Sequence, residues 1–267
     1  MDLGIPSHPI AEQRCAIVHS APVGRRYHRL TIDAGLLAGR TRPGQFYHLL
    51  CQDGPGVPYL RRPMSVWQVD DSRVSFLFNV TGRGTAALAT RRPGDSLSVV
   101  GPLGTGFTLD PAAKRILLVA RGAGLATLAP LAALAVRSGI AVDAVLSART
   151  PAEVMADAFP AGVSITGVAD SDATSDPDAV EALLRTLIDT ARPDAIYTCG
   201  SNRLLVLLQR LGTHYAVPGQ VALEQQMGCG LGMCFCCVRA VRTHEGIAHK
   251  RVCVEGPVFD LQSAISE

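Results

Sequence analysis

The first hundred residues alternate apolar and polar side chains in short runs, which is the pattern of β-strands. Between residues 13 and 108 the runs are four to eight residues long, and they read CAIVHS, YHRLTID, GQFYHLLC, MSVWQVD, RVSFLFNV and SLSVV. Arg-Pro-Gly turns at 42–44 and 92–94 separate some of them. Such runs between Gly/Pro turns predict an antiparallel β-barrel. We expect one helix within it, at residues 84–89.

From residue 114 the pattern changes to strands that alternate with helices. ILLVA, AVDAVLSA and AIYTC have the length of buried strands, whereas LATLAPLAALAVRSG and VEALLRTLIDTA carry apolar residues at helical spacing. This alternation predicts βαβ units and a parallel sheet, so the chain is a β-barrel followed by an α/β part. The polar loop at 171–178 contains acids and Pro177, which favour the start of the next helix.

One apolar stretch, at 116–136, has the length of a membrane span. It contains Arg121, Gly122, Gly124 and Pro130, and an arginine in a membrane helix costs about 2.5–3.5 kcal/mol. We therefore expect a buried strand, a glycine turn and a helix here, with no membrane association.

The composition excludes other classes of protein. The 267 residues carry a net charge of only +2, which argues against binding to nucleic acid through bulk charge. A hydrophobic fraction of 48% excludes intrinsic disorder. The seven histidines are dispersed without a metal-type spacing, so we assign no role to any of them.

Cysteines cluster near the C-terminus. Five of the eight fall within 25 residues: Cys229, Cys234, Cys236, Cys237 and Cys253. The N-terminal MDLGIPSHPI lacks the pattern of a secretory signal, so we expect a cytoplasmic, reducing location. There, clustered thiols bind metal more often than they form disulfides.

The spacing of these cysteines predicts an iron–sulfur cluster. Cys229-x4-Cys234-x2-Cys237 with a later Cys253 is the plant-type [2Fe-2S] spacing. The intervening glycines permit positive φ and let backbone amides approach the sulfides; they are Gly228, Gly230 and Gly232.

Two other readings of the cysteines stay open. A structural zinc site would usually show two short knuckles, and a disulfide would need an oxidising compartment. Cys236 is a fifth thiol in the loop, which we interpret as a small packed hydrophobe. An exchange of Cys236 for Cys237 as the ligand would shift the spacing by one residue.

Two motifs in the barrel point to a phosphate-bearing cofactor. Arg62-Pro63-Met64-Ser65 combines a guanidinium, which can bind a phosphate, with a rigid turn and a hydroxyl. The segment TGRGT at 81–85 leads from a strand into a short helix, an arrangement that can hold a pyrophosphate. Alone, the first motif is more often a surface arginine before a turn, but the two lie about twenty residues apart on one barrel.

These motifs together resemble a known family. The resemblance also rests on GPLG at 101–104 with Phe107, and on the C-terminal LEQQMGCGLGMCFCC followed by KRVCVEGPVF. Over nearly the whole chain the sequence resembles the electron transfer subunit of class B dihydroorotate dehydrogenase, in the ferredoxin reductase superfamily.

The resemblance implies three domains after an N-terminal tail at 1–12. These are a ferredoxin-reductase-like antiparallel FAD barrel at 13–110, a parallel-sheet, NAD-binding-type α/β domain at 111–218, and a small [2Fe-2S] domain at 219–267. The FAD contacts that it implies are Arg62, Pro63, Met64, Ser65, Leu77, Phe78, Asn79, Gly84 and Thr85. The cluster ligands that it implies are Cys229, Cys234, Cys237 and Cys253.

The resemblance also implies the function. An FMN-containing catalytic subunit would oxidise dihydroorotate, and this chain would pass the electrons through the cluster and FAD to NAD, within a hetero-oligomer such as a heterotetramer. The dihydroorotate site would belong to the partner, so no catalytic residue is expected here. The alternatives are a paralogous reductase that serves another dehydrogenase or an oxygenase, and a non-catalytic assembly subunit.

Two positions depart from the family pattern. The nucleotide turn of the family reads approximately GGGIGxAPL, whereas residues 120–128 here place Arg121 at a glycine position. An arginine there would either clash with NAD or contact it through its side chain. Ser201 follows Cys199-Gly200 where the superfamily commonly has proline. NAD is therefore left open as a co-substrate.

Overall fold

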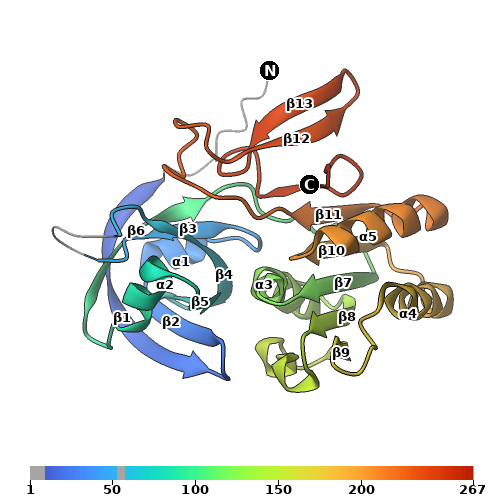
Figure 1. Ribbon diagram of the computed structural model, residues 1–267, viewed down its shortest axis with the longest axis horizontal. Helices are drawn as coiled ribbons and strands as arrows, with labels where there is room; N and C mark the ends of the chain where they lie inside the picture. The colour runs from blue at the N-terminus through green and yellow to red at the C-terminus, as the bar shows by residue number, and fades with distance from the viewer. Residues whose placement is uncertain (1–9, 53–57, 267) are drawn as a thin grey trace. The chain divides into compact units, whose positions relative to one another are not determined.

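The computed structural model describes residues 10–52 and 58–266, and the chain in it divides into two compact units (Figure 1). Unit 1 comprises Met1–Gly106, Glu224–Arg239 and Lys250–Pro257. Unit 2 comprises Phe107–Leu223, Ala240–His249 and Val258–Glu267. Residues 1–9 of the expected N-terminal tail lie outside the described residues, and the domain boundaries expected at 110 and 218 stay predictions.

Unit 1 is built on a closed antiparallel barrel with the strand order β1-β2-β5-β4-β3-β6. Its strands are β1 (Ala11–Val23), β2 (Tyr27–Asp33), β3 (Phe46–Leu49), β4 (Arg62–Asp70), β5 (Arg73–Asn79) and β6 (Ser96–Leu103). Helix α2 (Arg83–Ala89) is the predicted one, but the structure adds α1 (Leu36–Arg40). Expecting a single helix was wrong, because the five residues of α1 span little more than one turn and leave no clear helical period.

Side chains alternate between the inside and the outside of the barrel, as strand geometry requires. On β3, Tyr47 and Leu49 belong to the interior apolar cluster, whereas Phe46 and His48 do not. The interior cluster also takes Met64 from β4. The outer face of β3 and β4 can therefore pack against other segments of unit 1.

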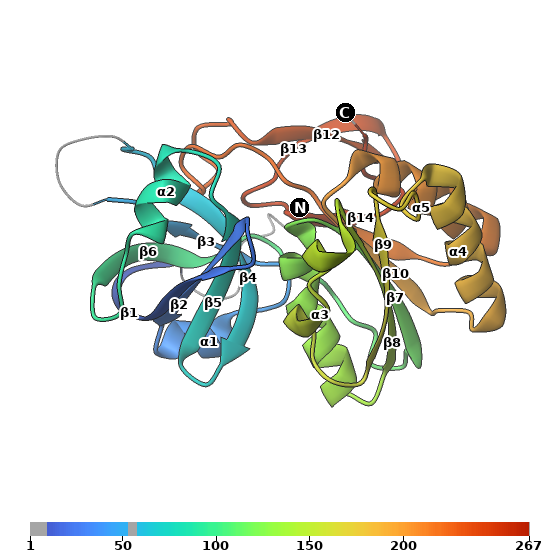
Figure 2. The ribbon, with the colours of Figure 1, turned by 60° about the horizontal axis from the view of Figure 1, so that its bottom comes forward.

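Unit 2 contains a six-stranded sheet with the order β14-β11-β10-β7-β8-β9, parallel except for β14. Its strands are β7 (Arg115–Arg121), β8 (Ala141–Ala148), β9 (Val163–Ala169), β10 (Ala195–Cys199), β11 (Gly219–Ala222) and β14 (Val258–Asp260). Figure 2 shows α3 (Gly124–Arg137) against one face, with α4 (Pro177–Thr190) and α5 (Asn202–Tyr215) against the other. Short 3-10 turns at Pro151–Glu153 and Ala156–Ala158 precede β9.

The predicted β-barrel plus α/β fold is confirmed, and so is the helix start at Pro177. The apolar stretch at 116–136 forms β7, a turn and α3, as expected. Within 10–52 and 58–266, no helix is both long and apolar enough to cross a membrane. The later β12 (Val238–Thr243) and β13 (Gly246–Arg251) pair as a two-stranded sheet.

Two glycine turns of unit 2 approach each other too closely for side chains. A Cβ added at Gly124 would lie 2.5 Å from Cys199 O, and one added at Gly200 would lie 2.3 Å from Arg121 O. Gly200 also has a φ of +100°, which disfavours other residues. The glycines at these strand ends are thus required by backbone packing alone.

Gly124→Ala should lower the free energy of unfolding by about 1–3 kcal/mol, because the added methyl group meets a backbone oxygen that cannot move aside. Gly39→Ala in α1 is the matched control, since a Cβ there meets no atom within 4 Å and alanine favours helix. Urea denaturation followed by circular dichroism measures both. Equal stability of the two variants would contradict the close approach.

Candidate functional site

The four predicted cluster cysteines lie in unit 1 and form two pairs. The thiols of Cys229 and Cys234 interact with each other, and those of Cys237 and Cys253 do the same. The second pair is fixed by the backbone, because Cys253 N donates to Cys237 Sγ over 3.4 Å and Val252 N donates to Cys237 O over 3.0 Å. Residues sixteen positions apart are thereby brought together.

Backbone amides of the loop point at these sulfurs. Leu231 N donates to Cys229 Sγ over 3.3 Å, and the amides of Met233 and Cys234 reach the same sulfur. Burial alone would raise the pKa of the Cys229 thiol, but these amides lower it to about 7. Donors aimed at sulfur favour the thiolate, which is the form that binds iron.

The second pair is less exposed. Burial, followed by the hydrogen bond and charge of Cys237, raises the pKa of the Cys253 thiol to about 12, against a smaller lowering by the amide of Gly232. Two such thiols cannot both ionise easily without a cation between them. A cation bound between these two thiols would stabilise both thiolates.

The donor set fits a two-iron cluster better than a single ion. Four cysteines ligate a [2Fe-2S] centre, two on each iron, and the loop presents two pairs of thiols. Within the described part of the chain, no three His, Cys, Asp or Glu side chains are grouped for one metal ion.

The structure also distinguishes the two adjacent cysteines. Cys237 is 2% exposed and faces Cys253, whereas Cys236 is exposed. The interpretation of Cys236 as a packed hydrophobe was wrong. Phe235, the residue before it, has a left-handed backbone conformation with a φ of +55°, and the side chain of Cys236 is exposed to solvent.

Arg251 braces the cysteine loop. Its Nη1 donates to Gly232 O over 3.1 Å, its Nε donates to Glu255 over 2.9 Å, and its guanidinium lies 5.4 Å from the ring centre of Phe235. Arg251 therefore stabilises the conformation of the cysteine loop.

The two barrel motifs meet in space. A Cβ added at Gly84 would lie 2.5 Å from Arg62 Nε, so the arginine side chain lies directly over the glycine. Asn79 Oδ1 is buried at the end of β5 and has no hydrogen-bond partner in the protein. A buried acceptor without a partner is costly, so it is expected to meet a donor on a ligand. These features fit a bound flavin nucleotide.

The predicted flavin contacts do not all present their side chains in the same way. Pro63, Ser65, Leu77 and Asn79 lie outside the interior apolar cluster, whereas Met64 and Phe78 belong to it. The side chains of Met64 and Phe78 therefore pack in the core of unit 1. The Thr85 hydroxyl accepts from the amides of Thr81 and Gly82, so it closes the turn before α2.

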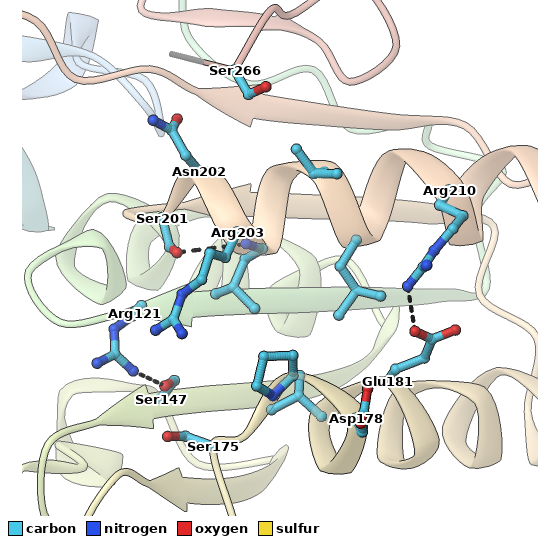
Figure 3. Close-up of a pocket in the computed structure, with 15 residues that line it drawn as sticks. Arg121, Ser147, Ser175, Asp178, Glu181, Ser201, Asn202, Arg203, Arg210 and Ser266 are labelled. Atoms are coloured by element: carbon cyan, nitrogen blue, oxygen red, sulfur yellow. Dashed lines mark hydrogen bonds and ion pairs between the residues drawn. The ribbon is translucent and has the colours of Figure 1, made fainter.

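Unit 2 has a pocket of about 600 Å³ at the carboxyl ends of its parallel strands (Figure 3). Ligands of open α/β sheets usually bind at this edge. Arg121 and Ser147 end β7 and β8 there, and Ser201, Asn202 and Arg203 stand at the start of α5. The pocket is therefore lined by several groups that can bind an anion.

Arg121 is held against the wall of this pocket. Its Nη1 donates to Ser147 Oγ over 2.6 Å, and its Nη2 lies 2.6 Å from Asp170 Oδ2. Hydrogen bonds from Arg121 and then Ser175 lower the pKa of the Asp170 carboxyl to about 2. The guanidinium is thus engaged by Ser147 and Asp170. Ser201 caps α5 by accepting from Leu204 N.

Comparisons with known proteins agree with this geometry. Residues 224–264 match the model of the iron-sulfur cluster binding domain of dihydroorotate dehydrogenase B. A protein of Geobacillus thermodenitrificans is 35% identical over 94% of this chain and 97% of its own length. One of Bacillus cereus is 32% identical over 95% and 98%. Both are named dihydroorotate dehydrogenase B (NAD(+)), electron transfer subunit.

The chain belongs to the family of dihydroorotate dehydrogenase B electron transfer subunits. It is accordingly an oxidoreductase component, and the resemblance drawn from the sequence is confirmed. Among solved structures, an NADH-dependent reduced ferredoxin–NADP oxidoreductase matches with a TM-score of 0.80 and 25% identity, covering 94% of this chain and 90% of that one. A ferredoxin reductase of carbazole 1,9a-dioxygenase, at 20% identity, covers 80% and 68% with a TM-score of 0.62, which supports the ferredoxin-reductase-like fold.

Sequence reasoning missed several residues of these sites. Asp170 and Ser147 are the partners of Arg121, and Arg203 lines the same pocket. The position of Ser147 near the end of a predicted strand could have suggested it. Asp170 follows β9, which the hydrophobic pattern did not predict because only two of its seven residues are buried.

Cys237→Ser should lose the cluster, whereas Cys236→Ser should keep it, because only Cys237 faces Cys253. Iron and acid-labile sulfide content of anaerobically purified protein, together with the visible spectrum, measure the difference. The two variants are matched in chemistry and differ by one position. Loss of iron in Cys236→Ser with retention in Cys237→Ser would reverse the assignment.

Proposed function

We propose that this chain relays electrons between an FMN-containing dihydroorotate dehydrogenase catalytic subunit and NAD, in pyrimidine biosynthesis. The relay uses a [2Fe-2S] cluster on Cys229, Cys234, Cys237 and Cys253, and FAD on the outer face of the barrel. The observation that carries the proposal is that two pairs of thiols and both flavin motifs belong to one compact unit. The dehydrogenase partner and NAD are part of the proposal because the names of the relatives include both.

The two cofactors have complementary chemistry: a flavin exchanges electrons in pairs, and a [2Fe-2S] cluster carries one at a time. The protein holds the cofactors and tunes them. Arg62, over Gly84, would bind the flavin phosphates, and Asn79 Oδ1 would accept from the flavin. The amides of residues 231–234 stabilise negative charge on the cluster sulfurs.

An exposed apolar surface supports a partner subunit next to the cysteine loop. Leu231, Met233 and Phe235 are all exposed, Met233 by 79%. Phe235 in addition has a φ of +55°, which costs about 1–3 kcal/mol for such a residue. Large apolar side chains held outward at this cost are typical of a protein–protein contact. We propose that the catalytic dehydrogenase subunit binds this surface, because members of the family are subunits of such an enzyme. The assembly would then be a hetero-oligomer.

The pocket of unit 2 is the proposed NAD site. Arg121 does not block it, because the guanidinium is held by Ser147 and Asp170 at the wall. Arg203 lines the pocket beside it and offers a cation to the nucleotide phosphates. A cytoplasmic location belongs to the same proposal, since cluster-binding thiols persist in a reducing compartment.

Two alternatives make different predictions for anaerobic protein mixed with NADH. Rapid bleaching of the flavin supports an enzyme, and its absence supports a non-catalytic assembly subunit. Co-purification with an FMN dehydrogenase favours the proposed relay over a free-standing reductase. A purified complex that oxidises dihydroorotate but passes no electrons to the flavin of this chain would overturn the relay.

Arg62→Ala should weaken FAD binding about 10- to 100-fold, because a charge-assisted hydrogen bond contributes about 1.5–3 kcal/mol. FAD fluorescence after equilibrium dialysis measures this affinity. Arg25→Ala, in the exposed turn between β1 and β2, is the matched control and should retain FAD. Equal FAD affinity in both variants would exclude a phosphate role for Arg62.

Arg203→Glu should raise the KM for NADH about tenfold or more with little change in kcat, because it places a negative charge in the pocket without touching the reacting atoms. Reduction of the flavin under steady-state conditions gives both constants. The control is Arg137→Glu at the exposed end of α3, outside the pocket. An unchanged KM would place the nucleotide elsewhere.

A further inference from the structure

His48 is a buried polar side chain that makes no hydrogen bond within the protein. It lies on β3 with 1% exposure, and neither Nδ1 nor Nε2 has a partner. An unsatisfied buried polar group costs about 1–3 kcal/mol. Native structures rarely retain two such atoms on one ring, so the imidazole is expected to have a partner outside the polypeptide.

The ring of His48 faces the cysteine loop within unit 1. A Cβ added at Gly230 would lie 2.8 Å from His48 Cε1 and 2.9 Å from both ring nitrogens. Gly230 has a φ of +69° and directly follows Cys229. Only a glycine allows the imidazole to approach the backbone of the loop this closely.

The other side of His48 belongs to the flavin motif. In the barrel, His48 pairs with Pro63 and Phe46 pairs with Ser65 on the neighbouring strand. Residues that pair across two strands share one face of the sheet. His48 therefore lies on the outer face that carries Pro63 and Ser65, and its ring lies against Gly230 of the cysteine loop.

The surroundings of His48 keep its ring neutral. Burial, followed by the charges of Arg61 and Arg62, lowers the pKa of His48 to about 4. Arg61 also holds the strand, because its Nη1 donates to His48 O over 3.4 Å and to Ser98 O over 3.0 Å. A neutral imidazole has one N–H donor and one acceptor nitrogen.

We propose that His48 donates an N–H hydrogen bond to a sulfur of the [2Fe-2S] cluster, and so acts as a positioning residue that makes the cluster easier to reduce. The inference rests on the proposed cluster site. Hydrogen bonds to the sulfurs are among the factors that set the potential of such clusters. The cluster rather than the flavin is the partner, because the end of the ring lies against the residue that follows Cys229.

The test compares His48→Phe, which fills the space without a donor, with His48→Asn, which keeps an N–H. An EPR-monitored redox titration of the reconstituted protein should show His48→Phe about tenfold harder to reduce, which is about 59 mV for a one-electron couple. In His48→Asn, which keeps an N–H donor, the cluster potential should lie closer to that of the wild-type protein than in His48→Phe. His28→Phe is the control, since that buried histidine of the same unit already bonds to Ser20.

Several outcomes would overturn the proposal. These are an unchanged cluster potential in His48→Phe, an equal shift in His48→Asn, and a shift of the flavin potential alone. If His48→Phe does not fold, pulsed EPR of the wild-type protein with ¹⁵N-labelled histidine decides, because absence of a weakly coupled histidine nitrogen refutes the bond. Iron content separates this question from the relay: a wild-type protein without a cluster would contradict the proposed function itself.

Discussion

The redox site depends on a short backbone contact at the end of the chain. Val252 N donates to Cys237 O over 3.0 Å, and this bond places Cys253 against the thiol of Cys237. Thr105 N donates to Gly256 O over 2.6 Å, which ties the same segment to the end of the barrel. Without these bonds the fourth thiol would lie on an independent tail, because the cysteine segment is too short to form its own core.

Three unfavourable local features lie in the same unit as this segment. His48 has two buried nitrogens without partners, Asn79 has a buried oxygen without one, and Phe235 holds a left-handed backbone conformation. Each costs free energy that the fold must offset elsewhere. Such features persist at functional sites because the ligand or partner, once bound, satisfies them. All three lie in the unit that carries the flavin motifs and the thiols.

In unit 2, the nucleotide pocket accommodates an arginine, Arg121, at the end of β7. Asp170 comes from the loop after β9 and Ser147 from β8, and together they hold Arg121 at the pocket wall. The arginine at the glycine position of the turn is thus held by polar side chains from the neighbouring strand and loop. Gly124 and Gly200, by contrast, are required by the contact between two backbones, whether or not a nucleotide binds.

The sequence alone predicted the barrel strands, part of the alternation of strands and helices, and the cluster type from the cysteine spacing, because these depend on local periodicity and on distances along the chain. It also indicated the family through its motifs. The tertiary structure decided which of Cys236 and Cys237 turns inward, that the side chains of Met64 and Phe78 belong to the core, and what Arg121 binds. It alone brought His48 to Gly230, 182 positions away in the numbering. Contacts between distant segments follow from how elements pack, and no local pattern records them.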